Sequence, residues 1–390
     1  MGMMSEYISR KLSAADLEAE LLKLISEYNK LRQTFATVYV AAIGKPIPDV
    51  PLNQDDYYLI HDLLRDVASR KVDLYLETPG GSGEAAEEIV RCLRNKFDQV
   101  SFVVSGEAKS AGTIMVLSGD EILMTETGSL GPIDAQVRIG RSVVSAYDYL
   151  EWTDQKSKEA KKAGKLNPFD ATMVAQISPG ELSDVFHALK YAEDLVTDWL
   201  VRYKFKTWTT TETRQIPVTA EMKTKQAQKI AAELMNHAKW RSHGRSIKAT
   251  DLQDIGLRVT RVESDPKLSD VVYRIQTVCR LLFSSTNTYK IFATEREKVF
   301  KTATPVSAVP IIPVQAADVV EFETRCPKCG KVHKLYAKFK DAPKIDEDFQ
   351  KKGNIAYPKD NKLKCECGFE IDLGGFRNDI ETKIGKKLII

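Results

Sequence analysis

The chain has 390 residues, of which 43% are hydrophobic and 28% are charged, a composition typical of a globular protein with room for two or three domains. Its 57 basic and 54 acidic residues leave a formal net charge of +3, so no bulk positive field argues for nucleic acid or for an anionic membrane. The sequence contains no run of about 18 apolar residues, the length of a membrane-spanning helix. We therefore expect a cytoplasmic protein without a membrane span, and a disordered, collagen-like or wholly coiled-coil chain is excluded.

The N-terminal part of the chain predicts two helices and a strand. Apolar residues recur at helical spacing over 12–33, where Ser13 is suited to cap the N-terminus. A strand is predicted at 37–43, followed by a proline-rich turn over 45–51 and an amphipathic helix over 55–69. We expect the first helix to pack on the main domain or on a partner subunit.

The segment from residue 72 to residue 125 alternates between strand and helix patterns with short connections. The predicted elements are a strand at 72–77, a helix over 84–97, a strand at 100–105, a helix over 110–117 and a strand at 121–125. Because right-handed crossovers join parallel strands, this order predicts an α/β fold with a parallel sheet covered on both faces. Ligands bind at the carboxyl ends of such strands, so a site is expected in the loops there.

The remainder of the chain predicts a polar, lysine-rich mobile loop at 153–167, several helices, and a proline-rich linker or extended edge segment at 301–316. The predicted helices cover 181–203, 219–240 and 270–283. We divide the chain into an N-terminal helix (1–34), a main domain (35–262), a helical extension with linker (263–318) and a cysteine-containing module (319–390).

Two loops of the main domain have residues suited to catalysis. The first, TPGGSG, runs from Thr78 to Gly83 after the first predicted strand of the sheet, and the second carries Ser110-Ala-Gly112 at the start of a helix. Backbone N–H groups at a helix start and beside glycines can approach a ligand without obstruction. Gly80, Gly81 and Ala111 are therefore candidates to bind an oxyanion formed at Ser110, where each good donor contributes roughly 3–4 kcal/mol. The first loop has neither the P-loop nor the dinucleotide-binding pattern of glycines.

With the motif Gly128-Ser-Leu-Gly-Pro-Ile-Asp-Ala-Gln136, these loops resemble serine peptidases of the Clp/crotonase fold. Among these, the sequence is most similar to the signal peptide peptidase A group and to the serine dehydrogenase proteinases, although Ala135 replaces a proline. The resemblance covers residues 35–262 and implies a Clp/crotonase-like ββα superhelix with Ser110 as nucleophile. It also implies a peptide or protein substrate and a homo-oligomer.

The general base is open among three alternatives. A serine hydroxyl must pass its proton to a neutral lysine or histidine before it attacks a carbonyl. The resemblance to signal peptide peptidase A implies a lysine within the stretch 156–165, and Lys165 has the most similar context. The Clp type would carry a histidine in Pro132–Gln136, where this chain has none, and Asp134 or Gln136 could instead bind substrate backbone or fix the loop. The other two alternatives are His243 and the absence of any base.

Four of the six cysteines form two close pairs near the C-terminus, Cys326 with Cys329 and Cys365 with Cys367. Four thiolates are a preferred ligand set for structural zinc, so we expect a β-rich zinc ribbon that binds Zn²⁺. His333 could substitute as a ligand, but with four cysteines available it is expected either beside the metal or on the surface. Lysines and aromatic residues alternate at 328–340, but acidic residues follow at once, so a protein partner or substrate is a better candidate ligand than nucleic acid.

The leading hypothesis is a cytoplasmic serine peptidase that works through a Ser110 acyl-enzyme. A catalytically inactive scaffold of the same fold, which binds peptides or partner proteins, is the main alternative because the base is weakly specified. A third reading, acyl-CoA chemistry of the crotonase type, would use carboxylates near the glycine loops, for which Glu84 and Glu107 are available.

Overall fold

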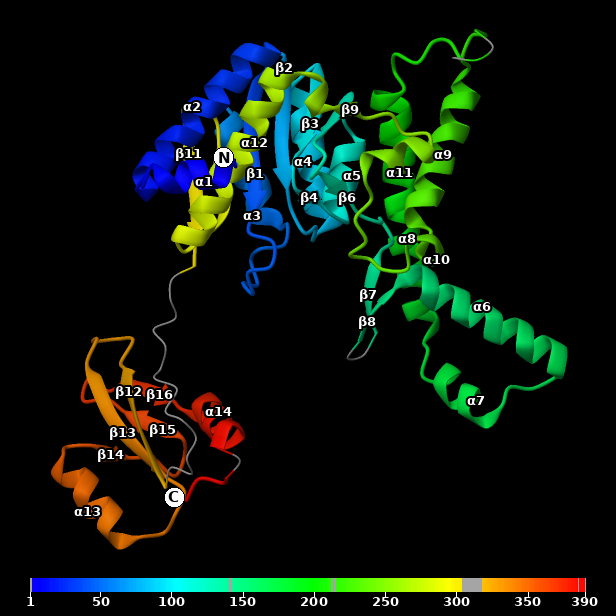
Figure 1. The fold of residues 1–390 in the computed structure, drawn as a ribbon. Helices are drawn as coiled ribbons and strands as arrows, with labels where there is room; N and C mark the ends of the chain where they lie inside the picture. The colour runs from blue at the N-terminus through cyan, green and yellow to red at the C-terminus, as the bar shows by residue number, and fades with distance from the viewer. Residues whose placement is uncertain are drawn as a thin grey trace. The chain divides into compact units, whose positions relative to one another are not determined.

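A seven-stranded sheet forms the centre of the first part of the chain (Figure 1). The computed structural model describes residues 2–139, 142–211, 213, 215–303, 318–384 and 386–389. The chain divides into two compact units, residues 1–304 and residues 305–390. The sheet belongs to the first unit.

The sheet is mixed, with a parallel centre. In spatial order its strands are β11 (Lys298–Thr302), β10 (Thr288–Ala293), β1 (Phe35–Ala41), β2 (Lys71–Glu77), β3 (Gln99–Val104), β5 (Glu121–Met124) and β9 (Thr260–Arg261). The strands from β1 to β9 are parallel, whereas β10 and β11 are antiparallel to their neighbours. This arrangement confirms the parallel α/β sheet predicted from residues 72–125.

Helices cover both faces of the sheet because apolar residues of successive strand positions point to opposite sides. On one face pack α1 (Met3–Ser9), α2 (Ala14–Arg32) and α12 (Pro266–Ser285). On the other face pack α3 (Gln54–Leu64), α4 (Gly83–Lys96) and α5 (Ala111–Leu117). Residues 266–302, expected to form a helical extension and linker, thus contribute α12, β10 and β11 to the main body.

A second group of helices lies beyond β5 (Figure 1). It consists of α6 (Ala146–Ala163), α7 (Pro168–Val174), α8 (Pro179–Trp199) with a π-helical end (Leu200–Lys204), α9 (Ala220–Met235), α10 (His237–Trp240) and α11 (Ala249–Asp254). Apolar residues of α8, α9 and α11 join the core on the α4 side of the sheet. Figure 1 shows α6 and α7 projecting away from the sheet.

The prediction of a mobile loop at 153–167 is wrong for most of that segment, because α6 extends to Ala163. The segment is rich in Lys, Glu and Ala, which are strong helix formers. An ion pair of 2.5 Å between Lys158 and Asp154 supports the helix surface, and Gly164 ends it with a φ of 75°.

Short two-stranded pairs connect the loops at the sheet edge. β4 (Glu107–Ala108) pairs with β6 (Ser129–Leu130), and β7 (Gln136–Ile139) forms a hairpin with β8 (Ser142–Ser145). The β4–β6 pairing brings the segment after β5 alongside the segment that carries Ser110.

The second unit is β-rich, as expected. Its elements are β12 (Val319–Arg325), β13 (Val332–Lys338), α13 (Pro343–Lys351), β14 (Ile355–Ala356), β15 (Lys362–Lys364), β16 (Glu370–Asp372) and α14 (Gly374–Ile384). Its small apolar core centres on Leu335, Tyr357 and Leu363. Of the predicted linker, residues 301 and 302 belong to β11, and residues 304–316 lie outside the described part. Across the described residues, no helix combines the length and apolar character needed to cross a bilayer.

Candidate active site

Ser110 occupies a strained backbone position directly before α5. Its φ of 50° and ψ of −118° lie in a region that residues with a Cβ rarely adopt. Such strain persists only where surrounding structure enforces it, and it is concentrated at functional sites. The side chain is half-buried at the carboxyl edge of the sheet. This geometry is that of a serine presented on a sharp strand-to-helix turn.

The glycine loop lies against this serine. A Cβ on Gly80 would be 2.7 Å from Ser110 Cβ and 2.7 Å from Lys109 O, so only glycine fits there, with a φ of 90°. Two backbone hydrogen bonds join the loops: Thr78 N–H donates to Glu107 O at 2.8 Å, and Lys109 N–H donates to Thr78 O at 3.0 Å. The two sequence motifs are therefore in direct contact.

Two backbone N–H groups, those of Ala111 and Gly80, belong to the residues packed around Ser110. Ala111 is the first residue of α5, so its N–H has no intrahelical acceptor. The Gly80 N–H donates to Thr78 Oγ1 at 3.2 Å, a long bond within the loop itself. A substrate oxygen that binds Gly80 would therefore share or replace this bond.

Gly81 is fixed by Leu52, which lies two residues before α3. Leu52 N–H donates to Gly80 O at 2.7 Å, and Ser82 N–H donates to Leu52 O at 2.9 Å. A Cβ on Gly81 would lie 2.3 Å from Leu52 O, and its φ is 148°. Leu52 thus holds the outer edge of the glycine loop.

Lys109, which precedes the serine, is buried with 6% of its surface exposed. Its Nζ donates to Leu130 O and Ser246 Oγ at 3.0 Å, to Arg245 O at 3.2 Å and to Ser129 Oγ at 3.3 Å. Burial lowers the pKa of Lys109, against the opposing charge of Glu107. This lysine ties the serine turn to two segments that are distant in sequence, 129–130 and 245–246.

The segments held by Lys109 lead to a buried carboxylate with two histidines. Asp134 is fully buried, and its Oδ1 and Oδ2 contact His243 Nδ1 at 2.8 Å and His237 Nδ1 at 2.9 Å. Gln136 Nε2 also donates to Asp134 Oδ2 at 2.9 Å. Burial alone would raise the pKa of Asp134, but the hydrogen bonds from the two histidines lower it below its ordinary value. The pair of residues expected to bind substrate or fix the loop, Asp134 and Gln136, are thus bonded to each other.

The two histidines differ in the contacts of their second ring nitrogen, Nε2. His237 Nε2 lies 3.4 Å from Asp148 Oδ2, whereas His243 Nε2 has no partner among the described residues. No hydrogen bond joins His243 to Ser110 within the described structure. They are linked through Lys109, whose Nζ binds the backbone two residues after His243.

The structure does not bring Lys165 to Ser110. It is exposed in the connection between α6 and α7, and within the described residues no hydrogen bond or ion pair links it to either catalytic loop. Its neighbours in the run are paired locally: Lys156 contacts Asp170 at 2.9 Å, and Lys158 contacts Asp154. Of the predicted site residues in the first unit, Ser110, Gly80, Gly81 and Ala111 form one cluster, and Lys165 lies outside it.

Sequence reasoning missed Lys109 and His237. Lys109 was indistinguishable from a surface lysine because its four acceptors come from residues that are 20 or more positions away. His237 lies within the helix predicted over 219–240, where no residue pattern indicates a role for it. The only signal in the sequence was the presence of two histidines six residues apart, His237 and His243.

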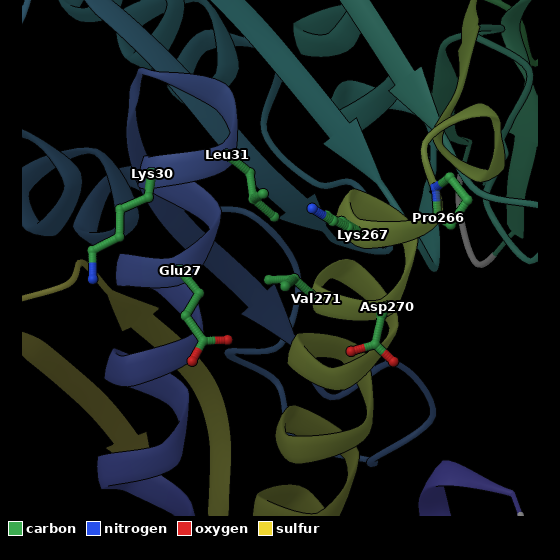
Figure 2. A pocket seen from close by; sticks show the side chains of 7 residues that line it. All are labelled: Glu27, Lys30, Leu31, Pro266, Lys267, Asp270 and Val271. Atoms are coloured by element: carbon green, nitrogen blue, oxygen red, sulfur yellow. The ribbon is translucent and has the colours of Figure 1, made fainter.

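A surface groove of about 550 Å³ lies between α2 and α12 (Figure 2). Figure 2 shows Leu31 and Val271 between the two helices, with charged residues at the rim. None of its lining residues belongs to the glycine loop or to the Ser110 turn. This groove is separate from the candidate active site.

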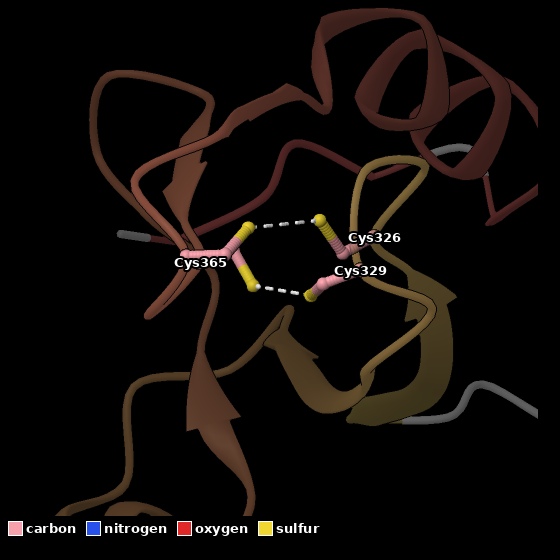
Figure 3. Close-up of side chains that lie close together, drawn as sticks. Cys326, Cys329 and Cys365 are labelled. Carbon is pink, nitrogen blue, oxygen red and sulfur yellow. Dashed lines mark hydrogen bonds between the residues drawn. The ribbon is translucent and has the colours of Figure 1, made fainter.

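The four C-terminal cysteines converge in the second unit (Figure 3). All four sulfur atoms lie within 4.8 Å of one another, with 3.6 Å between Cys326 and Cys367 and 3.6 Å between Cys329 and Cys365. A tetrahedral ion with metal–sulfur bonds of about 2.3 Å would place its sulfur ligands roughly 3.8 Å apart. The donor set therefore fits a metal ion. His333 is buried, and its Nε2 lies 3.2 Å from Cys365 Sγ, beside the cluster rather than in it.

Residues 42–166 match the family model of the ClpP-like SDH-type serine proteinases, which confirms the predicted resemblance. The uncharacterized protein MJ0137 of Methanocaldococcus jannaschii is 28% identical over 127 residues, which are 31% of this chain and 44% of that protein. The uncharacterized protein MJ1495 of the same organism is 27% identical over 95 residues, 24% of this chain and 32% of that protein. The chain thus spans less than half the length of these curated relatives.

Two proteases are among the solved structures that match this chain. The 1510-N membrane-bound stomatin-specific protease matches at 12% identity with a TM-score of 0.32, over 57% of this chain and 79% of that chain. ClpP1 from Listeria monocytogenes matches at 12% identity with a TM-score of 0.32, over 62% of this chain and 98% of that chain. The family match and the parallel sheet together confirm the predicted fold class, with its small β-rich C-terminal module.

Proposed function

We propose that this protein is a serine peptidase that hydrolyses peptide bonds through an acyl-enzyme on Ser110. The observation that carries this proposal is the strained Ser110 backbone with the Gly80 backbone packed directly against it. An ordinary helix N-cap requires neither feature. The match of residues 42–166 to a serine proteinase family supports the same assignment, because that segment contains both loops.

The N–H groups of Ala111 and Gly80 bind the oxyanion in this proposal, with Gly81 shaping the loop. Ser110 Oγ forms a bond to the carbonyl carbon of the substrate, and the carbonyl oxygen gains the negative charge. Each preorganised donor accelerates such a step by about 10²–10³. The C–N bond then breaks, the amine leaves with the proton taken from Ser110, and water hydrolyses the remaining acyl ester.

We assign the general base to His243, oriented by Asp134. A histidine whose Nδ1–H donates to a carboxylate has Nε2 available to accept a proton. His243 meets this condition, because its Nδ1 contacts Asp134 at 2.8 Å and its Nε2 has no partner in the described structure. Hydrogen bonds at catalytic sites often become short only when substrate is bound. Lys165 is the rival base, and it would act only if the connection between α6 and α7 approached Ser110.

An inactive peptide-binding scaffold is the second candidate function. The observation that favours it is the lack of a hydrogen bond between Ser110 and any base in the described residues. Such a protein would keep the strained serine turn without hydrolysing its ligand.

Three further properties belong to this proposal: a metal site, a cellular location and an oligomeric state. We propose that the four cysteines bind one structural Zn²⁺ ion, with the second unit presenting a substrate or partner protein. Four thiolates suit a reducing compartment, which supports a cytoplasmic location. A homo-oligomer is expected from the Clp-like fold.

Hydrolysis of a fluorogenic peptide library by four purified proteins tests the mechanism. We expect Ser110→Ala to abolish hydrolysis and His243→Ala to lower kcat by about 10³-fold or more, while Lys165→Ala retains the wild-type rate. Full activity of His243→Ala with loss in Lys165→Ala would replace the histidine base with the lysine. Wild-type protein that cleaves no peptide under any condition would support the scaffold.

A further inference from the structure

A buried ion pair lies behind the glycine loop, outside the catalytic residues. Asp56 of α3 and Lys290 of β10 both have fully buried side chains, and Lys290 Nζ contacts Asp56 Oδ2 at 2.6 Å and Oδ1 at 2.8 Å. Tyr39 of β1, also buried, donates its hydroxyl to Asp56 Oδ2 at 2.9 Å. A buried ion pair can often be replaced as a whole by apolar residues without loss of stability, so its presence here suggests a role beyond stability. Removal of one partner alone is destabilising, because it leaves the other charge buried and unpaired.

Lys301 Nζ also lies 3.9 Å from Asp56 Oδ1, and two further hydrogen bonds of the pair end on the two neighbours of Leu52. Lys290 Nζ donates to Pro51 O at 3.0 Å. The Asn53 N–H donates to Asp56 Oδ2 at 3.0 Å. The backbone is thus fixed to buried charges on both sides of Leu52.

Leu52 in turn determines where the glycine loop lies. Its N–H and C=O bond to Gly80 O and Ser82 N, on either side of Gly81. Gly80 is the residue whose backbone lies against Ser110. A continuous chain of hydrogen bonds therefore runs from the ion pair through Leu52 to the loop that faces the nucleophile.

We propose that the Asp56–Lys290 pair is a positioning element for the oxyanion loop, acting through the backbone of Leu52. This inference rests on the proposed function, since it assigns the loop its role in binding the oxyanion. Hydrogen bonds are directional, whereas apolar packing is not. The charge-assisted hydrogen bonds of this pair therefore fix the Pro51 carbonyl and the Asn53 amide at set positions. Catalytic groups lose activity when they are displaced by about 1 Å.

A second buried carboxylate at the other end of the sheet provides a matched control. Asp73 lies near the start of β2, is 3% exposed, and accepts bonds from Tyr28 Oη at 2.6 Å and Arg32 Nε at 3.1 Å. It makes no contact with Leu52 or the glycine loop among the described residues. Asp73→Asn therefore weakens a buried charge network of the same sheet without touching the loop.

The test compares Lys290→Met, Tyr39→Phe and Asp73→Asn in the full chain, well below their unfolding temperatures. Two readouts are used: the rate of covalent labelling by a fluorophosphonate, and amide hydrogen exchange in residues 50–53 and 79–83. We expect Lys290→Met to slow labelling by about 100-fold, and Tyr39→Phe, which keeps the ion pair, by about 3–10-fold. Both should raise exchange in the two segments, and Asp73→Asn should change neither readout.

The two readouts separate this inference from the proposed function. If wild-type protein is not labelled but Lys290→Met still raises exchange in both segments, the peptidase proposal fails and the positioning role stands. If Lys290→Met does not fold, Tyr39→Phe alone decides the question by the same measurements. Exchange and labelling that match those of Asp73→Asn would overturn the inference.

Discussion

Ser110 differs from an ordinary helix cap in both its backbone and its neighbours. A capping serine has an extended backbone and bonds an amide of the first turn, as Ser82 does before α4. Ser110 has a positive φ and makes no side-chain cap bond. The motif Ser110-Ala-Gly112 predicts a sharp turn at the start of a helix from the sequence alone, and the structure places Ser110 at such a turn.

The proposed general base, His243, could not be predicted from the sequence. Its orienting carboxylate, Asp134, is 109 positions from His243, and only the folded chain shows them in contact. Lysine spacing pointed to Lys165 instead, in a stretch that folds as a surface helix and its exit. Amino-acid composition cannot distinguish a buried lysine from a solvated one, so the burial of Lys109 could not be predicted.

The buried carboxyl group of Glu77, at the end of β2, is expected to make the free energy of unfolding depend on pH. The side chain is 1% exposed and contacts Arg280, and burial raises its pKa to about 7. The folded state therefore holds a proton that the unfolded state releases near pH 4.5. This contribution is fully present below about pH 4.5 and is lost as the pH rises through about 7.

The corresponding experiment is urea unfolding of wild type and Glu77→Gln at pH 5 and pH 8. We expect the difference in unfolding free energy between the two proteins to shift by about 2–3 kcal/mol in favour of the variant at pH 8. A difference that is independent of pH would show that Glu77 titrates in the folded protein as it does in water.

At the scale of elements, the contact between the glycine loop and the serine turn is the critical packing. Gly80→Ala would place a methyl group 2.7 Å from Lys109 O, at a φ of 90°. We expect a loss of about 1–3 kcal/mol in unfolding free energy and at least a 100-fold slower fluorophosphonate labelling.

Gly164→Ala is the matched control for this substitution. Gly164 also has a positive φ, 75°, but a Cβ there meets nothing within 4 Å. It should lose about 1 kcal/mol from backbone strain and label at the wild-type rate. If both variants label alike, steric contact at Gly80 does not control the serine.

The order of elements from β2 to β5 was predictable because short connections and clear periodicity restrict the topology there. The antiparallel addition of β10 to β1 was not, since the partners are about 250 residues apart and periodicity carries no pairing information. The helix α6 was not predicted because its polar, lysine-rich sequence is also typical of a loop. For β10 the missing information was a tertiary contact. For α6 it was the helix propensity of residues whose polar composition also suits a loop.

At the scale of the whole molecule, the two units are expected to respond differently to metal removal. The second unit has a small apolar core, so a metal ion bound by its four cysteines would supply much of its folding free energy. We expect one zinc ion per chain by elemental analysis, and loss of the unit's thermal transition with a chelator or in Cys326→Ser. The transition of residues 1–304 should remain.

The opposite result would separate the cysteines from folding. If the second unit keeps its transition after chelation and no metal is detected, the cysteine cluster has another role. Labelling of Ser110 in the chelated protein serves as the control that the first unit is intact.

The most direct test of the central claim is a fluorophosphonate reaction followed by mass-spectrometric mapping of the adduct in the full chain. We expect one adduct per chain, on the peptide that contains Ser110, and none in Ser110→Ala. Wild-type protein that remains unlabelled while folded, or that carries the adduct on another residue and labels equally as Ser110→Ala, would contradict the assignment of Ser110 as the nucleophile.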